Sequence, residues 1–317
     1  MELLDCLPAE LRGPTTTIAP IAAGLSGAGV YRVEANGQTF VLKIARDDHP
    51  LEVWQRSVEI LRMASDAGVS PRLIHADEAK RAVVTAFVVD RVFPALLMNP
   101  ATRADAIGQL GRMLRRVHDL PLLEGMAPRD PRDLLTMVVG WLGEFPLPSF
   151  VTELTAQIQA EVPPPRDRPD VLNHGDLNPT NLTYDGERVM LLDWDTSGPG
   201  DPFYDLASIS LFFRFDDETC RALIAAHDGA PLDPGPLPAR FLYCRKLVAV
   251  MIGSMFFHLA RMAGHAGATG GERLDTALGL LELYPKMRDG SLSLHTGDGR
   301  WAFGLALFKT LAALANC

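Results

Sequence analysis

The sequence predicts an α+β protein with two lobes, a small and mostly antiparallel sheet with one helix followed by a larger, mainly helical lobe. Its 317 residues exceed what a single hydrophobic core usually holds. Runs rich in β-branched and aromatic residues fill the first part of the chain, whereas from about Asn99 the apolar residues take the spacing of amphipathic helices. We therefore expect a first lobe over residues 1–89 and a second over residues 90–317.

Short β-rich runs mark the strands of the first lobe. Two of them, VYRVE and TFVLKIA, are joined through Asn36-Gly37, and this dipeptide favours a tight hairpin between strands. A helix follows, because Pro50 suits its first turn, Gly68 suits its end, and its apolar residues share one face. Two more strands, RLIHAD and AVVTAFVV, complete the predicted sheet across the turn DEAK.

The helices of the second lobe are predicted from apolar residues three and four positions apart. Ile107, Leu110 and Leu114 define the first of them, which ends before Pro121. Short β-rich runs at residues 182–184 and 189–192 interrupt the helical pattern. Further helices are expected at residues 134–145, 149–160, 203–213, 219–227, 240–263, 273–283 and 301–314.

The composition and the first residues of the chain indicate which partners and which cellular compartment to expect. The chain is 47% hydrophobic and 22% charged, which is typical of a globular protein, and its net charge of -9 argues against binding nucleic acid. The first residues lack the pattern of a secretion signal, so we expect a cytoplasmic protein. The four cysteines lie far apart and are expected to be reduced packing residues. The longest apolar run, residues 247–260, is too short to cross a bilayer, so we expect a buried helix and no membrane partner.

Two stretches carry oxygen ligands at the ends of predicted strands. In NHGDLNPTNL, residues 173–182, Asp176 stands five positions before Asn181, and in LLDWD an apolar strand ends on Asp193. An amide and a carboxylate suit Mg²⁺, which prefers oxygen ligands shared between protein, water and phosphate. Asp176 could orient a substrate hydroxyl and accept its proton. This division of roles is that of phosphoryl transfer.

A nucleotide site is expected in the first lobe. Ser26 and Gly27 lie in a turn before a predicted strand, where backbone N–H groups could approach phosphates, although glycine in a hairpin is often only turn chemistry. Lys43 lies in the middle of FVLKIA, where a phosphate would give its ammonium a partner; an edge-strand lysine that discourages aggregation is the alternative. As its carboxylate partner we expect Glu59 of the following helix rather than Glu52.

The combination of HGDLNPTN, LLDWD, GPGDPFYDLA and FVLKIA resembles the aminoglycoside phosphotransferase and choline kinase superfamily, over roughly residues 24–207. The resemblance implies a protein-kinase-like fold and the activity of a small-molecule kinase. It implies Asp176 as the catalytic aspartate and Asn181 and Asp193 as the Mg²⁺ ligands. The phosphoryl donor that it implies is ATP, with GTP not excluded.

The same resemblance implies roles for residues around these three. In the first lobe Lys43 would contact the α and β phosphates, and the backbone from Phe87 to Val89 would meet the adenine. His174 and Asp205 would support the catalytic loop without touching the transferred group. The remaining positions that it assigns are the partner of the lysine and two loop residues that cover the phosphates, namely Glu59, Ser26 and Gly27.

Departures from protein kinases favour a small-molecule acceptor. Gly175 precedes Asp176, whereas a protein kinase has an arginine before its catalytic aspartate. The chain also passes from Asp193 to the predicted helix at residue 203 in one short loop. That loop leaves no room for a peptide-docking segment or its phosphorylation switch.

The class of acceptor is suggested by charge. Residues 171–235 contain twelve Asp and Glu against three Arg, an excess that favours a cationic acceptor if it lines the cleft, with Asp195 and Asp201 as candidate contacts. DWD resembles the DWE of choline-type and thiamine-type relatives, whereas LSGAGVYRV is closer to the aminoglycoside side, so a cationic and a polyhydroxylated acceptor both stay open. Aromatic residues of the second lobe could furnish a cation site or belong to the core: Phe212, Phe213, Phe215, Tyr243, Phe256, Phe257 and Trp301.

Two other function classes stay open. One is a nucleotide-binding protein with a kinase-like fold and no turnover. The other is a metal-dependent phosphoesterase, because Asp47-x-His49 and Asn173-His174 echo fragments of a two-metal site. The phosphoesterase leaves the strand position of Lys43 unexplained.

Overall fold

The computed structural model describes residues 2–21, 28–46, 48–128 and 130–315. The chain folds as two compact units, each assembled from separate segments. The first unit comprises Met1–Met126, Val171–Pro199 and Asp216–Pro234, and the second comprises Ala127–Asp170, Gly200–Phe215 and Gly235–Cys317. The lobe boundary expected after residue 89 stays a prediction.

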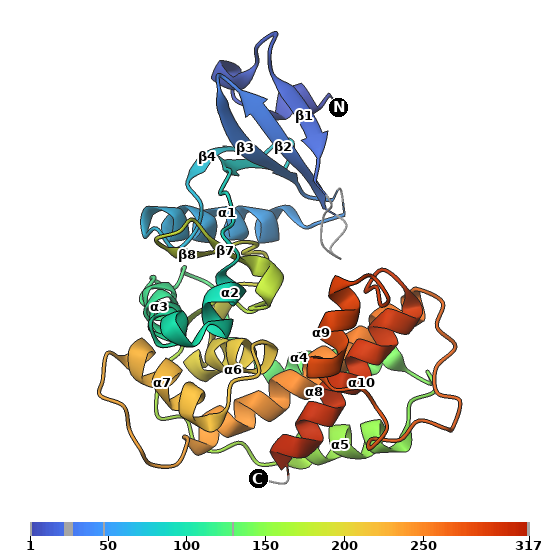
Figure 1. The fold of residues 1–317 in the computed structure, drawn as a ribbon. Coiled ribbons are helices and arrows are strands. Elements are labelled where there is room, and N and C mark those ends of the chain that lie inside the picture. Colours follow the sequence, from blue (N-terminus) through green and yellow to red (C-terminus); the bar gives the residue numbers. More distant parts are fainter. Residues whose placement is uncertain (1, 22–27, 47, 129, 316–317) are drawn as a thin grey trace. The chain divides into compact units, whose positions relative to one another are not determined.

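The first unit contains a five-stranded antiparallel sheet, of which Figure 1 labels β1, β2, β3 and β4. Its order is β1-β2-β3-β5-β4, and the strands are β1 (Thr17–Pro20), β2 (Gly29–Ala35), β3 (Gln38–Ile44), β4 (Leu73–Asp77) and β5 (Ala82–Ala86). Asn36 and Gly37 both have positive φ, at 53° and 72°, as the two-residue turn between β2 and β3 requires. The predicted hairpin and sheet are confirmed.

The two faces of this sheet carry different neighbours. One face packs Leu42 and Val84 against residues of two short 3-10 turns, η1 (Leu3–Cys6) and η2 (Ala9–Leu11). On the other face Val83, which is paired with Lys43 across the ladder, packs against Trp54 and Val58 of helix α1 (Leu51–Asp66). Because side chains alternate along a strand, Lys43 lies on the α1 face.

The rest of the first unit, in its described residues, consists of three helices and several short strands and turns. It contains α2 (Phe93–Met98), α3 (Pro100–His118), β6 (Val171–Asn173), η3 (Pro179–Asn181), β7 (Leu182–Tyr184), β8 (Val189–Leu191) and α7 (Asp217–Asp228). Strands β7 and β8 form a hairpin, and β6 pairs with β9 (Gly198–Gly200). Helices α3 and α7 pack closely at Gly111. A Cβ at this position would lie 2.6 Å from the Cβ of Ala226, so the contact requires glycine.

The described part of the second unit is helical, with α4 (Pro131–Leu142), α5 (Ser149–Ala160), α6 (Pro202–Phe212), α8 (Ala239–Met262), α9 (Leu280–Arg288) and α10 (Gly297–Ala315). Helix α8 contacts α4, α5, α6 and α10 (Figure 1). By length and composition it could cross a membrane, but more than half of its most apolar window is buried inside the structure. That burial is the setting of the core helix expected from the sequence.

One predicted helix is displaced along the chain. The sequence predicts a helix over residues 273–283, whereas α9 begins at Leu280. The N–H of Gly279 donates to the Glu282 carboxylate at 2.7 Å, which satisfies a backbone donor at the start of the helix. Residues before Gly279 form turns instead. Their apolar spacing resembled that of a helix, and the capping interaction sets the true start.

Candidate active site

The loop between β6 and β7 holds the Asp176 carboxylate by two side-chain amides. The Asn181 Nδ2 donates to the Asp176 backbone oxygen and to its Oδ2, both at 2.9 Å, and the Asn178 Nδ2 donates to Oδ1 at 3.1 Å. The orientation of Asn178 follows from Thr180, whose backbone N–H donates to the Asn178 Oδ1 at 2.9 Å. Asp176 itself is exposed. A carboxylate held on both oxygens and open to solvent can meet a substrate hydroxyl in a defined orientation.

The β7–β8 hairpin brings Asp193 to the same end as Asn181. Leu182 is paired with Leu191, and the N–H of Leu192 donates to the Asn181 backbone oxygen at 2.9 Å. Asn181 directly precedes β7 and Asp193 follows β8 by two residues, so the two expected Mg²⁺ ligands leave the hairpin side by side. Asp193 has φ of 63°, a left-handed conformation that few non-glycine residues adopt.

Lys43 binds two carboxylates of the segment after β8. Its Nζ lies 2.8 Å from the Asp193 Oδ1 and 2.8 Å from the Asp195 Oδ2. Burial disfavours the ammonium, but the charges of Asp195 and Asp193 outweigh it and hold the pKa of Lys43 above its usual 10.5. Burial likewise disfavours the Asp193 carboxylate, and the Lys43 ammonium outweighs this and holds the pKa of Asp193 below 3.8. The strand lysine is thus joined to the segment that carries an expected metal ligand.

The expected pair of Lys43 with Glu59 is not formed. Glu59 is exposed on α1 and lies 3.8 Å from Arg62, one turn along the same helix. The buried face of α1 is occupied by apolar residues such as Trp54, which leaves Glu59 on the solvent side. The sequence showed which helix follows the lysine, but Asp195, about 150 positions away, is the acid that reaches it together with Asp193.

Gly175 allows the loop between β6 and β7 to lie directly against the segment after β8. It has φ of +84°, and a Cβ there would come within 2.8 Å of the Thr196 backbone oxygen. The neighbouring His174 is fully buried, its Nε2 lies 2.9 Å from the Leu192 oxygen, and its own backbone oxygen accepts from the Thr196 hydroxyl at 3.1 Å. The positive φ and the close approach both call for glycine. The sequence showed Gly175 only as a departure from protein kinases, without this reason.

For the other residues expected to bind the nucleotide or to support the loop, the structure does not test the role. Ser26 and Gly27 lie outside the described residues. The N–H of Phe87 donates to the Thr39 oxygen at 3.2 Å, and Val89 is 70% exposed. Asp205 is fully buried in α6. The adenine contact of residues 87–89 and the support from Asp205 stay predictions.

Asp201 does not present its carboxylate to an acceptor. It is 4% exposed, accepts from the Phe203 N–H at 2.9 Å as the cap of α6, and lies 2.6 Å from the Arg240 Nε. A buried carboxylate with these partners is structural. These contacts do not support its role as an acceptor contact, which stays a prediction; the sequence did not indicate that an arginine from α8 pairs with it. Asp195, the other candidate, is 39% exposed and paired with Lys43.

The aromatic residues of the second lobe mostly belong to its core. Phe257 is fully buried and packs against Trp301, with ring centroids 4.8 Å apart, and against Phe308 at 5.6 Å. Tyr243 is 1% exposed. These contacts are those of packing.

The donor atoms of Asn181 and Asp193 are of the kind that magnesium takes. Asn181 and Asp193 offer an amide and a carboxylate, the oxygen ligands that Mg²⁺ takes alongside water and phosphate. Among the described residues no group of three or more His, Cys, Asp or Glu could hold a metal ion. Asp47, part of the phosphoesterase hypothesis, lies outside these residues.

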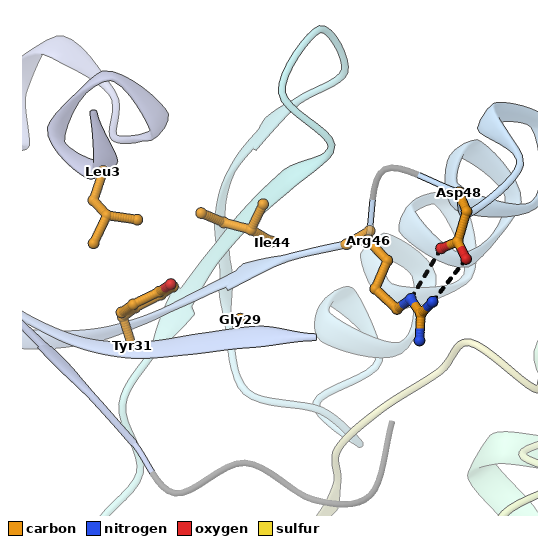
Figure 2. A pocket seen from close by; sticks show the side chains of 7 residues that line it. Leu3, Gly29, Tyr31, Ile44, Arg46 and Asp48 are labelled. Atoms are coloured by element: carbon orange, nitrogen blue, oxygen red, sulfur yellow. Dashed lines mark hydrogen bonds and ion pairs between the residues drawn. The ribbon is translucent and has the colours of Figure 1, made fainter. Parts of the chain in front are cut away.

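A hollow of about 580 Å³ lies away from this site. Figure 2 shows the Leu3, Tyr31 and Ile44 side chains that line it, with an Arg46–Asp48 ion pair beside them. Tyr31 and Ile44 pack on the sheet face covered by the N-terminal 3-10 turns, opposite to Lys43. Lys43 does not line this hollow.

Known proteins resemble this chain in sequence and in fold. The model of the Phosphotransferase enzyme family matches residues 17–242. A choline/ethanolamine kinase family protein from Mesorhizobium loti is 20% identical to this chain and superposes with a TM-score of 0.59. The match covers 99% of this chain and 97% of the Mesorhizobium chain. Choline kinase LicA from Streptococcus pneumoniae is 13% identical over 93% of each chain, with a TM-score of 0.60.

A spectinomycin phosphotransferase, solved with ADP and spectinomycin, is 13% identical over 92% of this chain and 93% of its own, with a TM-score of 0.56. At these identities the superpositions show a shared kinase-like fold. A search of curated protein sequences finds no match.

Proposed function

Because the chain belongs to the Phosphotransferase enzyme family and is a small-molecule phosphotransferase, we propose that it moves the γ-phosphoryl group of ATP to a hydroxyl of a small acceptor. The observation that carries this proposal is the Asp176 carboxylate, held by two amides beside the hairpin end that bears Asn181 and Asp193. That constellation offers a base and two oxygen ligands within one short segment.

Each residue then has a role that its contacts support. Asp176 orients the acceptor hydroxyl and takes its proton at a carboxylate oxygen. Asn181 and Asp193 would hold Mg²⁺, which supplies charge neutralisation on the phosphates. Lys43, now bound to two carboxylates, offers its ammonium to the phosphates of the nucleotide. The chain supplies position and charge compensation, which is what this reaction demands.

The acceptor is a small cationic or polyhydroxylated molecule, of the choline, thiamine or aminoglycoside kind. The net charge of -9 and the excess of acids in residues 171–235 favour a cation. Relatives of the same fold include choline kinase LicA and a spectinomycin phosphotransferase, whose acceptors fit these two descriptions. ADP bound in the latter supports an adenine nucleotide as the donor.

A coupled ADP-release assay with ATP and Mg²⁺ tests the proposal. The acceptor panel contains choline, ethanolamine, thiamine, homoserine, methylthioribose, aminoglycosides and macrolides. Asp176→Asn should lower the transfer rate at least a hundredfold while ATP binding, measured by calorimetry, stays within twofold. Asp185→Asn, a carboxylate in the turn of the β7–β8 hairpin, serves as the matched control and should retain the activity.

The outcomes separate the hypotheses. Transfer that is lost only in Asp176→Asn supports the reaction and identifies the acceptor class. Comparable transfer by Asp176→Asn overturns the role of this residue. Tight, Mg²⁺-dependent ATP binding without transfer to any acceptor of the panel would favour the nucleotide-binding protein without turnover.

A further inference from the structure

The segment that follows β5 is tied to strand β7, which lies about ninety positions further along the chain. The Asp90 Oδ1 accepts from the Tyr184 N–H at 3.0 Å, and the Arg91 N–H donates to the Tyr184 oxygen at 2.8 Å. The Phe93 ring packs edge-on against the Tyr184 ring, with centroids 5.6 Å apart. β7 thus pairs with β8 on one edge and with residues 90 and 91 on the other.

The backbone beside this tie is strained. Val92 has φ of 55°, a left-handed conformation that is a clear outlier for a β-branched residue. Its N–H also donates to the Asp90 Oδ1, at 3.2 Å, and its side chain is 56% exposed, so burial of the valine does not explain the conformation. Strain of this kind persists where the surroundings impose the geometry, and it clusters at functional segments.

Both ends of the tie lead to proposed parts of the site. Residues 87–89, expected to meet the adenine, directly precede Asp90. Tyr184 ends β7, whose first residue follows Asn181, and β7 is paired with β8, which leads to Asp193. The hydrogen bonds at Tyr184 therefore fix the end of the adenine segment relative to the hairpin that carries the expected metal ligands.

We propose that Asp90 is a positioning residue. Its hydrogen bond holds the adenine segment, residues 87–89, at a fixed distance from the β7–β8 hairpin, and this distance matches the separation of adenine and phosphates in one nucleotide. This inference rests on the proposed function, because it takes residues 87–89 and the Asn181–Asp193 hairpin end as the two ends of a nucleotide site. Asp90 touches neither the transferred group nor the acceptor. It pre-organises the site, so that adenine and phosphates are bound together without a cost in alignment.

If the hydrogen bond of Asp90 only stabilised the fold, its loss would not affect Mg·ATP binding selectively. The β7–β8 hairpin contains a second aspartate that serves as a control for this case. The Asp185 Oδ1 also accepts from two backbone N–H groups, those of Glu187 and Arg188, both at 2.8 Å. It closes the β7–β8 turn and does not touch the adenine segment. Replacing Asp185 or Asp90 by alanine removes the same kind of hydrogen bond, but only the second change removes a hydrogen bond between β7 and the segment that follows residues 87–89.

The experiment compares the affinities for adenosine and for Mg·ATP by calorimetry in wild type, Asp90→Ala, Asp90→Asn and Asp185→Ala. Adenosine lacks the phosphates and needs only the adenine segment, whereas Mg·ATP needs both ends of the site. In Asp90→Ala the Kd of Mg·ATP should rise about fivefold, the effect of one net hydrogen bond, and that of adenosine should change less than twofold. Asp90→Asn, which keeps the acceptor oxygen, and Asp185→Ala should both stay within twofold of wild type for both ligands.

Each result decides the question. A selective loss of Mg·ATP affinity in Asp90→Ala alone supports the inference. Equal losses in Asp90→Ala and Asp185→Ala, or no selective loss in Asp90→Ala, overturn it while the proposed reaction stands on its own transfer assay. A wild type that binds neither adenosine nor Mg·ATP overturns both the inference and the proposed function. Asp90 is exposed, so its replacement leaves the core intact and the variants fold.

Discussion

A methyl group at position 175 should force apart the two loops that form the site. Gly175→Ala places a Cβ where φ is +84°, which costs about 1–2 kcal/mol for a residue with a side chain. That Cβ would also lie 2.8 Å from the Thr196 oxygen, a backbone atom that no side-chain rotation can move. Displacing it strains the hydrogen bond from the Thr196 hydroxyl to His174, so we expect a total loss of about 3 kcal/mol in the free energy of unfolding.

Gly264→Ala is the matched control for this prediction. Gly264 has φ of +85°, and no described atom lies within 4 Å of its ideal Cβ, so this variant meets the conformational cost alone. Urea unfolding should show a loss about twice as large for Gly175→Ala as for Gly264→Ala. The transfer rate should fall at least tenfold only in the former, because Asp176 moves with its neighbour. Equal losses of stability and unchanged transfer would refute the close approach of the two loops.

Two ion pairs give further predictions. Lys43→Met should lower the free energy of unfolding by about 1 kcal/mol near neutral pH. The pKa of Asp193 is depressed below 3.8, so the stabilisation from its carboxylate is present above pH 3.8 and is lost as the pH falls through the folded pKa. The pKa of Lys43 is raised above 10.5, so the stabilisation from its ammonium is present below pH 10.5 and is lost as the pH rises through the folded pKa. Urea unfolding of both proteins should therefore give a constant difference from about pH 5 to 9 that shrinks in stronger acid. Arg240→Ala deprives the buried Asp201 of its nearest cation and should cost about 3 kcal/mol in the same assay, whereas the exposed Arg273→Ala should cost less than about 0.5 kcal/mol.

The elements of this fold were predictable because their signals are local. The Asn36-Gly37 turn, the apolar spacing of α1 and the β-rich runs of the sheet each depend on neighbours a few positions apart. The start of α9 was misplaced because one carboxylate, that of Glu282, determines where the helix begins. Helical spacing by itself does not locate a boundary.

The site was predictable in its residue types and less so in its contacts. The strand position of Lys43 indicated that it has a partner with negative charge, and its partners are Asp193 and Asp195. Which acids approach depends on how distant segments pack, and the spacing of Glu59 along one helix carries no such information. For the same reason the sequence did not indicate that Asp201 is buried and paired with an arginine from α8.

Helix α8 has a consequence for how the second unit opens. With 24 residues it is about 36 Å long, and it touches four other helices, so no local fluctuation can expose its amides without separating those contacts. We therefore expect the amide hydrogens of its buried middle to be among the slowest to exchange with solvent in this unit, and their exchange to report on global unfolding. When that happens, an apolar segment long enough for a bilayer faces water, and we expect it to promote aggregation of the unfolded chain.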